Sequence, residues 1–243
     1  MKKRALSVML ASVMALSLAA CGSGSAKDVN AKSEGVMTYA EYVAAPVDSE
    51  VTVETYVQAA QGWWQDAGTF YTQDGEGGYF LYGMPVSEAE YNKLTPGTKI
   101  KVKGYKTEWS GEVEITDATY EIEEGSYVAP AEDVTSKLGT DDLINYMNRF
   151  VSFKGMTVEA ANDAGDACMY NWDGSGTQGD DLYFNVSVNG NTYSFTVESY
   201  LCGPDTDVYK AVENLQVGDV VDMEGFLYWY EGPNPHVTSV KVK

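Results

Sequence analysis

The sequence predicts an all-β chain, rich in strands with a few short helices, that folds into two tandem five-stranded barrels. The first observation is a glycine-bracketed strand pattern that occurs twice, at residues 97–105 (GTKIKVKGY) and 218–226 (GDVVDMEGF). Apolar and polar residues alternate within each copy, which is typical of a strand with one buried face. The second observation is that the segments around the two copies follow the same order, and such internal repetition indicates a duplicated structural unit.

The two copies begin alike. Residues 51–60 (VTVETYVQAA) match residues 151–161 (VSFKGMTVEAA), and each segment predicts a first strand. A short helix is expected before each strand, because Thr38 to Glu41 fits a capping box and residues 140–148 look helical.

Each copy continues with a hairpin. The first hairpin turns at residues 74–77 (DGEG), and the second turns at Asn189-Gly190, a strong two-residue turn signal. The remaining elements also correspond, with short helices expected at 87–94 and 205–215 and last strands at 113–122 and 236–242. The order strand, strand, strand, helix, strand, strand is that of a five-stranded OB barrel.

The N-terminus has the layout of a secretory signal. Three positive residues, Lys2, Lys3 and Arg4, precede an uncharged apolar stretch at 5–20. That stretch is shorter than the ~20 residues of a membrane-spanning helix. An ordinary signal peptide and an uncleaved anchor helix are the alternatives. The Gly- and Ser-rich residues that follow predict a flexible tether.

The segment Leu18-Ala19-Ala20-Cys21 resembles the lipobox of bacterial lipoproteins, in which the signal is cut before a cysteine that carries a diacylglycerol. Together with the glycine-bracketed fourth strand and the Trp-Ser-Gly turn at 109–111, it makes the chain resemble tandem OB-fold lipoproteins of Gram-positive bacteria. The resemblance implies a protein held by lipid on Cys21 at the outer, extracellular face of the cell membrane. The expected divisions are a signal peptide at 1–20, a tether at 21–35, a first OB-like domain at 36–128 and a second at 129–243.

The charge is strongly acidic. The chain has 36 Asp and Glu against 16 Lys and Arg, a formal net charge of −20, which becomes −23 when the signal and its three positive residues are removed. Affinity for nucleic acid comes largely from lysine and arginine displacing counterions. Composition therefore predicts that the protein does not bind nucleic acid.

Little in the sequence indicates catalysis. The single histidine, His236, lacks an evident nucleophile, and the cluster of His or Cys ligands that zinc requires is missing. We therefore expect a non-enzyme with no catalytic residues, no metal and no cofactor. Cys168 and Cys202 are interpreted either as a disulfide or as two free thiols, because spacing alone fixes no pairing geometry.

Aromatic residues are the candidate ligand-binding residues. OB barrels bind ligands between the loops that join the first to the second strand and the fourth to the fifth strand. Aromatic rings in or near these loops predict a stacking surface, although packing that closes the barrel mouths is the alternative. The predicted ligand-binding residues are Trp63, Trp64, Tyr71, Tyr79, Tyr82, Trp109, Tyr170, Trp172, Trp229 and Tyr230.

These features predict a non-enzymatic binding or scaffolding module for a glycan, a cell-wall component, a peptide or an envelope protein. An auxiliary subunit of an envelope or solute-capture complex is the alternative, and a hydrolase of envelope polymers is a further one. The basic stripe of the first copy is expected to be structural, with Lys99, Lys101 and Lys103 pairing across the hairpin with Glu112, Glu114 and Asp117.

Overall fold

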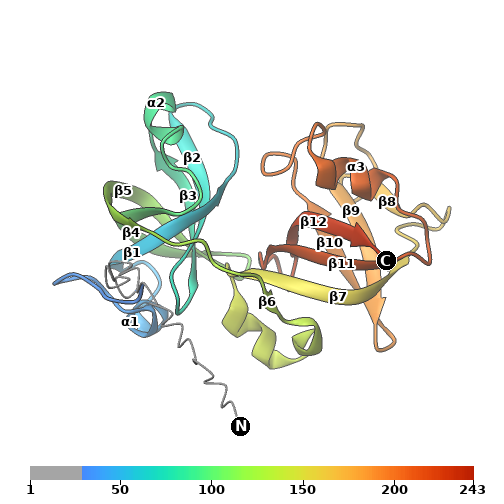
Figure 1. The fold of residues 1–243 in the computed structure, drawn as a ribbon, viewed down its shortest axis with the longest axis horizontal. Helices are drawn as coiled ribbons and strands as arrows, with labels where there is room; N and C mark the ends of the chain where they lie inside the picture. The colour runs from blue at the N-terminus through green and yellow to red at the C-terminus, as the bar shows by residue number, and fades with distance from the viewer. Residues whose placement is uncertain (1–28) are drawn as a thin grey trace, which may run out of the picture.

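The computed structural model describes residues 29–243, and its strands form two closed barrels that lie side by side (Figure 1). The predicted signal peptide, Cys21 and the first part of the predicted tether lie outside the described residues. Within residues 29–243, no helix combines the length and the apolar character needed to cross a membrane.

The first barrel has the predicted strand order. Helix α1 (Tyr39–Ala44) begins with the expected capping box of Thr38 and Glu41. Around the barrel the order is β1-β2-β3-β5-β4, with β4 paired to β1 and β3 parallel to β5. The elements are β1 (Glu50–Ala60), β2 (Ala67–Gln73), β3 (Gly78–Pro85), α2 (Glu88–Tyr91), β4 (Thr98–Trp109) and β5 (Glu112–Ser126).

The second barrel repeats this arrangement. Its five strands close in the order β7-β9-β10-β12-β11, again with the third and fifth strands parallel. Two short strands, β6 and β8, extend the sheet at its edges, and the segment expected to be helical before β7 is a 3-10 helix, η2. The elements are β6 (Glu132–Asp133), η1 (Thr135–Lys137), η2 (Asp141–Tyr146), β7 (Phe150–Glu159), β8 (Cys168–Tyr170), β9 (Leu182–Val188), β10 (Asn191–Val197), α3 (Asp207–Glu213), β11 (Val220–Phe226) and β12 (His236–Val242).

The bracketing glycines have the same physical role in both barrels. Gly97 and Gly218 open the fourth strand with φ of +94° and +96°, a left-handed conformation that favours glycine. Gly104 and Gly225 lie where the fifth strand crosses closely, and a Cβ at either position would collide with a backbone carbonyl of that strand. The repeated pattern therefore records two backbone requirements of the barrel, which confirms the predicted all-β, duplicated fold.

The expected pairing of the lysine stripe is wrong in register. Lys99, Lys101 and Lys103 lie opposite Glu123, Glu121 and Thr119, because the turn at Ser110-Gly111 pairs residues 112–116 with residues 105–109 instead. Lys99 bridges Glu54 and Glu123 at 2.7 and 2.8 Å. Glu112 and Glu114 are thereby left without lysine partners, and both are buried.

The C-terminal end of the predicted tether packs against the first barrel. The Lys32 Nζ atom donates to Asp74 Oδ2 at 2.6 Å and to the Glu54 carbonyl oxygen at 2.8 Å. The Asp74 side chain is fully buried and also accepts the hydroxyl of Tyr79 at 2.9 Å. The ordered unit therefore begins before residue 36.

We expect Lys32→Met to lower the free energy of unfolding by about 3 kcal/mol, because it leaves the buried Asp74 carboxylate without its counter-charge. Denaturant unfolding of the full chain measures this change. The matched control is Lys103→Met, whose ion pair with Glu50 is about half exposed on both sides and whose loss we expect to cost at most about 1 kcal/mol. Equal losses in the two variants would show that Lys32 is not a buried anchor.

Candidate functional site

The two barrels share a small aromatic core of their own. Tyr71 of β2 and Phe80 of β3 pack against Phe226 of β11, and all three side chains are buried. The rings of Tyr71 and Phe226 are stacked, with centroids 4.3 Å apart and planes 9° from parallel. The Tyr71 hydroxyl also forms a hydrogen bond with His236 Nδ1 at 2.9 Å. Tyr71 therefore joins the barrels through both its aromatic ring and its hydroxyl group.

Backbone groups add further cross-barrel contacts. They are the hydrogen bonds from Phe150 N to Gln73 Oε1 at 2.7 Å, from Asn148 Nδ2 to the Val113 carbonyl at 3.0 Å and from Gly62 N to the Tyr200 carbonyl at 2.9 Å. These bonds come from loops and strand ends on both sides of the contact. The barrels consequently meet along a continuous seam instead of at one point.

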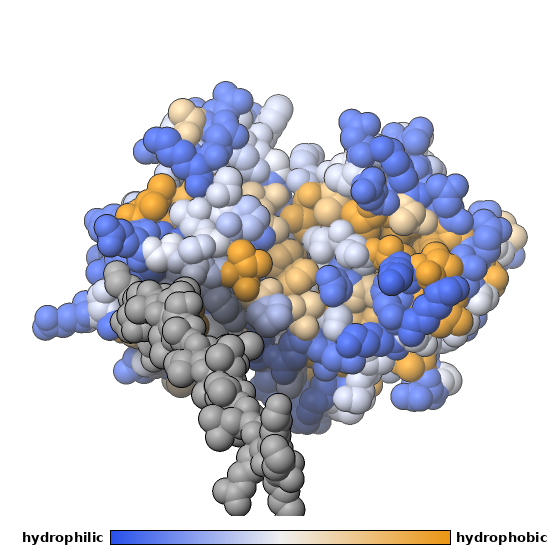
Figure 2. Space-filling model, in the orientation of Figure 1, coloured by the Kyte–Doolittle hydropathy of each residue, from blue (hydrophilic) through white to orange (hydrophobic). Residues whose placement is uncertain are grey.

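A cleft of about 700 Å³ lies along this seam. The first barrel lines it with Phe80, Tyr82 and Trp109, and the second with Trp172, Tyr183, Tyr228 and Tyr230. Trp109 and Tyr230 face each other across the barrels with ring centroids 5.1 Å apart. On the face shown in Figure 2, pale to orange residues gather between the two lobes, and most residues on the lobes are hydrophilic, with orange patches among them. The cleft is thus a concave aromatic surface built by both barrels.

The charged side chains that line the cleft are all acidic. They are Asp181, Glu198 and Glu231, and neither lysine nor arginine is among the lining residues. Glu198 is buried, and its carboxylate accepts hydrogen bonds from the backbone N–H groups of Tyr200 at 3.2 Å and Leu201 at 2.8 Å. Burial, and then the nearby charge of Asp181, raises the pKa of Glu198 to about 7. Within the described residues, no ion pair offsets this carboxylate.

His236 also lines the cleft. Its ring stacks on Tyr228, with centroids 4.4 Å apart, and its Nδ1 atom is bonded to the Tyr71 hydroxyl. Burial lowers the pKa of His236 to about 3. The imidazole is therefore neutral at neutral pH and adds a ring and a polar nitrogen, not a charge, to the site.

Two more carboxylates lie at the seam outside the cleft. Glu112 is fully buried, and burial raises its pKa to about 8, although the hydrogen bond from the Trp229 N–H offsets part of the rise. Burial likewise raises the pKa of Glu114 to about 7. Both groups therefore change charge near neutral pH, and Glu112 does so inside the contact between the barrels.

The structure brings four of the ten predicted ligand-binding residues to the cleft. These are Tyr82, Trp109, Trp172 and Tyr230, and their exposed fractions of 45–75% leave their rings accessible. These four residues are far apart in the sequence, and two come from each barrel, so the packing of the barrels places them together.

Five of the other predicted residues lie elsewhere. Trp63 packs on the first core and donates its Nε1–H to the Val86 carbonyl at 2.9 Å, as the packing alternative proposed. Tyr71 and Tyr79 are fully buried, and Trp229 packs on the second core. Trp64 is exposed but is not among the residues that line the cleft.

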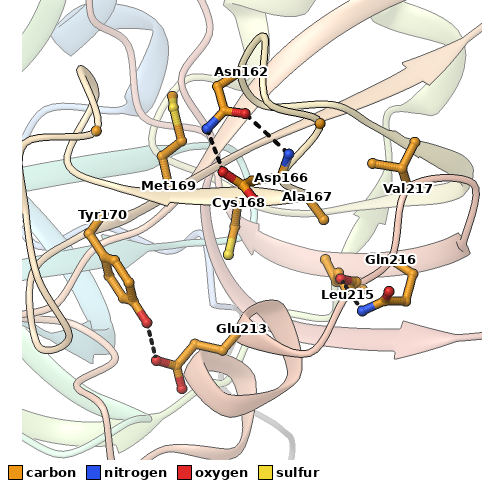
Figure 3. Close-up of a pocket in the computed structure, with 12 residues that line it drawn as sticks. Asn162, Asp166, Ala167, Cys168, Met169, Tyr170, Glu213, Leu215, Gln216 and Val217 are labelled. Carbon is orange, nitrogen blue, oxygen red and sulfur yellow. Dashed lines mark hydrogen bonds between the residues drawn. The ribbon is translucent and has the colours of Figure 1, made fainter.

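Tyr170, the remaining predicted residue, lies in a separate, more polar pocket of the second barrel (Figure 3). Its hydroxyl donates to Glu213 Oε1 at 2.8 Å, and Asn162 Nδ2 donates to Asp166 Oδ2 at 2.8 Å. The polar groups of this pocket are thus largely paired with one another. Cys168 also lines it, and in the structure both Cys168 and Cys202 are free thiols whose pKa values are raised by burial.

Sequence reasoning missed several residues of the cleft. Tyr228 belongs to the aromatic run 226–230 (FLYWY), which was a usable signal. Phe80, Glu198 and His236 had no such signal, because each is one residue of an ordinary strand or strand end. Among residues 29–243, no group of three or more His, Cys, Asp or Glu side chains is placed to hold a metal ion.

No protein-family model matches the sequence, and no curated protein matches it. Several solved structures do. The HIN1 domain of p202 in complex with a 12-mer double-stranded DNA is 13% identical, with a TM-score of 0.36, over 81% of this chain and 94% of that one. A murine DNA-binding protein bound to double-stranded DNA is 12% identical, with a TM-score of 0.34, over 79% and 94%. The single-stranded DNA-binding protein from Thermus aquaticus is 14% identical, with a TM-score of 0.28, over 80% and 93%.

The strand order of the two barrels defines the chain as a tandem OB-fold protein. The neighbours also contradict two predictions made from the sequence. They are OB-fold proteins that bind nucleic acid and not glycan or envelope binders, so the predicted glycan, cell-wall, peptide or protein module and the predicted exclusion of nucleic acid are corrected. At this identity the likeness describes the fold alone. The chemistry of this chain's ligand has to be argued from its own residues.

We expect the free energy of unfolding to fall as pH rises from about 4.5 to about 8. Over this window the folded state keeps the proton on Glu112 while the unfolded chain has already lost it. Glu112→Gln is therefore expected to gain on the order of 2–4 kcal/mol over the wild type at pH 8 and little at pH 4.5. Denaturant titrations at several pH values measure the difference.

Glu121→Gln, an exposed position on the same strand, makes the same charge change and is the control. The opposite dependence from His236, whose neutral folded state loses stability below pH 6.5, cancels between variant and wild type. A difference between Glu112→Gln and the wild type that does not change with pH would contradict the assignment.

Proposed function

We propose that the cleft between the barrels binds a small organic cation that carries a flat or bulky apolar group. One observation carries the proposal: the lining of the cleft combines seven Phe, Tyr and Trp rings with three carboxylates, a neutral histidine and neither lysine nor arginine. A cation over an aromatic face is attracted by the ring quadrupole, and the attraction is strongest where water is excluded. The ligand is expected to bind without chemical turnover.

The buried carboxylate gives the cleft its preference for positive charge. Among the described residues, two backbone N–H groups stabilise ionised Glu198, and the neighbouring Asp181 opposes its ionisation. A bound cation supplies the missing counter-charge and favours the ionised form. Affinity is therefore expected to rise as pH increases through about 7.

The aromatic walls select the apolar part of the ligand. Trp109 and Tyr230 form a tilted pair, and Tyr228 stacks on the neutral His236 beside them. Such rings bury a large apolar area and hold it in a defined orientation. The cleft volume of about 700 Å³ is within the range of small-molecule sites.

Benzyltrimethylammonium is a suitable probe, with benzyl alcohol and benzoate as neutral and anionic counterparts. We expect saturable quenching of tryptophan fluorescence by the cation, with a Kd below about 1 mM, and weaker binding of the other two. Tyr230→Ala should weaken the cation about tenfold or more, because a desolvated cation–π contact contributes up to about 2 kcal/mol.

The matched control is Trp64→Ala, which removes an exposed aromatic ring that does not line the cleft and should leave the Kd unchanged. Glu198→Gln should lower affinity at pH 8 but have little effect at pH 6. Equal binding of all three probes would contradict the proposal. So would a single-stranded oligonucleotide that bound through the same residues while the cation did not.

We also propose that the chain is exported and attached by a lipid on Cys21 to the outer face of a bacterial membrane. The support is the positive start, the short apolar stretch and the Leu-Ala-Ala-Cys segment. Two acyl chains or more give durable membrane attachment, whereas one holds a protein only marginally.

Cys21→Ser is expected to abolish incorporation of radiolabelled fatty acid and to shift the chain from the membrane fraction to the soluble fraction. Expression in a Gram-positive host followed by fractionation measures both. Cys202→Ser, a change to a buried thiol, is the control and should keep the label. Retention of residues 1–20 on the wild-type chain, shown by mass spectrometry, would contradict the anchoring proposal.

A further inference from the structure

The loop between β11 and β12, residues 227–235, builds one wall of the cleft. It contributes Tyr228, Tyr230, Glu231 and Asn234. Its own backbone hydrogen bonds are few, and they include Tyr230 N to the Gly232 carbonyl and Asn234 N to the Tyr228 carbonyl. A nine-residue connection with so little internal bonding needs outside contacts to hold one conformation.

Those contacts come from the equivalent turn of the first barrel. Trp229 N donates to Glu112 Oε2 at 2.8 Å, and Glu231 N donates to the Ser110 carbonyl at 2.7 Å. The ring of Tyr230, between these two donors, lies against Trp109. Three successive residues of the loop are therefore held by residues 109–112, each through a different group.

Glu112 is the side chain on which this arrangement depends. It is fully buried, so water does not readily replace its oxygen when the carboxylate is removed. The space beside it is also closed, because a Cβ on Gly111 would lie 2.9 Å from Trp229 Cδ1. The turn thus fits the loop closely, and within residues 29–243 the Trp229 N–H donates to Glu112 alone.

We propose that Glu112 is a positioning residue for the cleft: by accepting the Trp229 N–H from the other barrel, it holds Tyr230 and Glu231 in the conformation that receives the ligand. The inference rests on the proposed cation site but concerns a residue that does not line it. Ligand binding then depends on contact between the barrels as well as on the cleft residues themselves.

The test compares Glu112→Ala, Glu112→Gln and the control Glu121→Ala in the full-length chain. Affinity for benzyltrimethylammonium and amide hydrogen exchange are measured for each. Glu112→Ala should weaken binding at least tenfold and speed exchange at Trp229 and Glu231 without speeding it in the strands. Glu112→Gln keeps an acceptor oxygen and should bind within about threefold of the wild type. Glu121→Ala should match the wild type in both measurements.

The two proposals fail in distinguishable ways. If the wild type binds no organic cation, the proposed function is wrong, while the exchange at Trp229 and Glu231 still tests the role of Glu112. If the wild type binds the cation and Glu112→Ala binds it equally well, the positioning role is wrong. Faster exchange throughout both barrels would also overturn it, by showing a general loss of stability. Glu112→Leu, which fills the same space without an acceptor, replaces Glu112→Ala if that variant does not fold.

Discussion

The contact of Tyr71 with the second barrel is the constraint on which the rest of the structure depends. Its ring is stacked on Phe226 and its hydroxyl is bonded to His236, so one fully buried side chain fixes both the spacing and the rotation of the barrels. A buried hydroxyl without a partner is costly, which makes the relative position of His236 and Tyr71 specific. The cleft lies along the seam that this contact helps to hold together, and both barrels line it.

Burial also sets the electrostatics of the protein. Desolvation raises the pKa of Glu112, Glu114 and Glu198 toward neutrality, and Glu112 is buried where it accepts the Trp229 N–H of the other barrel. An acidic chain thereby has three carboxyl groups that change charge near pH 7. The raised pKa values of these three carboxyl groups are therefore a consequence of packing, since none of the residues has an unusual sequence context.

Local patterns predicted the barrels well, and tertiary contacts explain what they missed. The bracketing glycines Gly97 and Gly218 could be recognised in the sequence because each meets a local backbone requirement, a positive φ at the start of the fourth strand. The predicted partners of the lysine stripe were wrong because the register of the β4–β5 hairpin decides which residue lies opposite each lysine. A shift in register changes all of these partners together. Trp63 and Trp109 had equivalent sequence contexts, yet the first became core and the second entered the cleft. That choice is made by the other barrel, about which the local sequence carries no information.

The two barrels use different faces to meet: the first offers its second and third strands, through Tyr71 and Phe80, and the second offers its fourth and fifth, through Phe226 and His236. Separate identical copies joined in this head-to-tail way would each keep an unused face and would go on adding subunits into a filament. When two diverged copies are joined in one chain, the addition of barrels stops at two. In the first barrel the position equivalent to Phe226 is Tyr105, which remains 45% exposed. Because the two copies differ in sequence, neither has to be complementary to itself, and the pair forms one asymmetric unit.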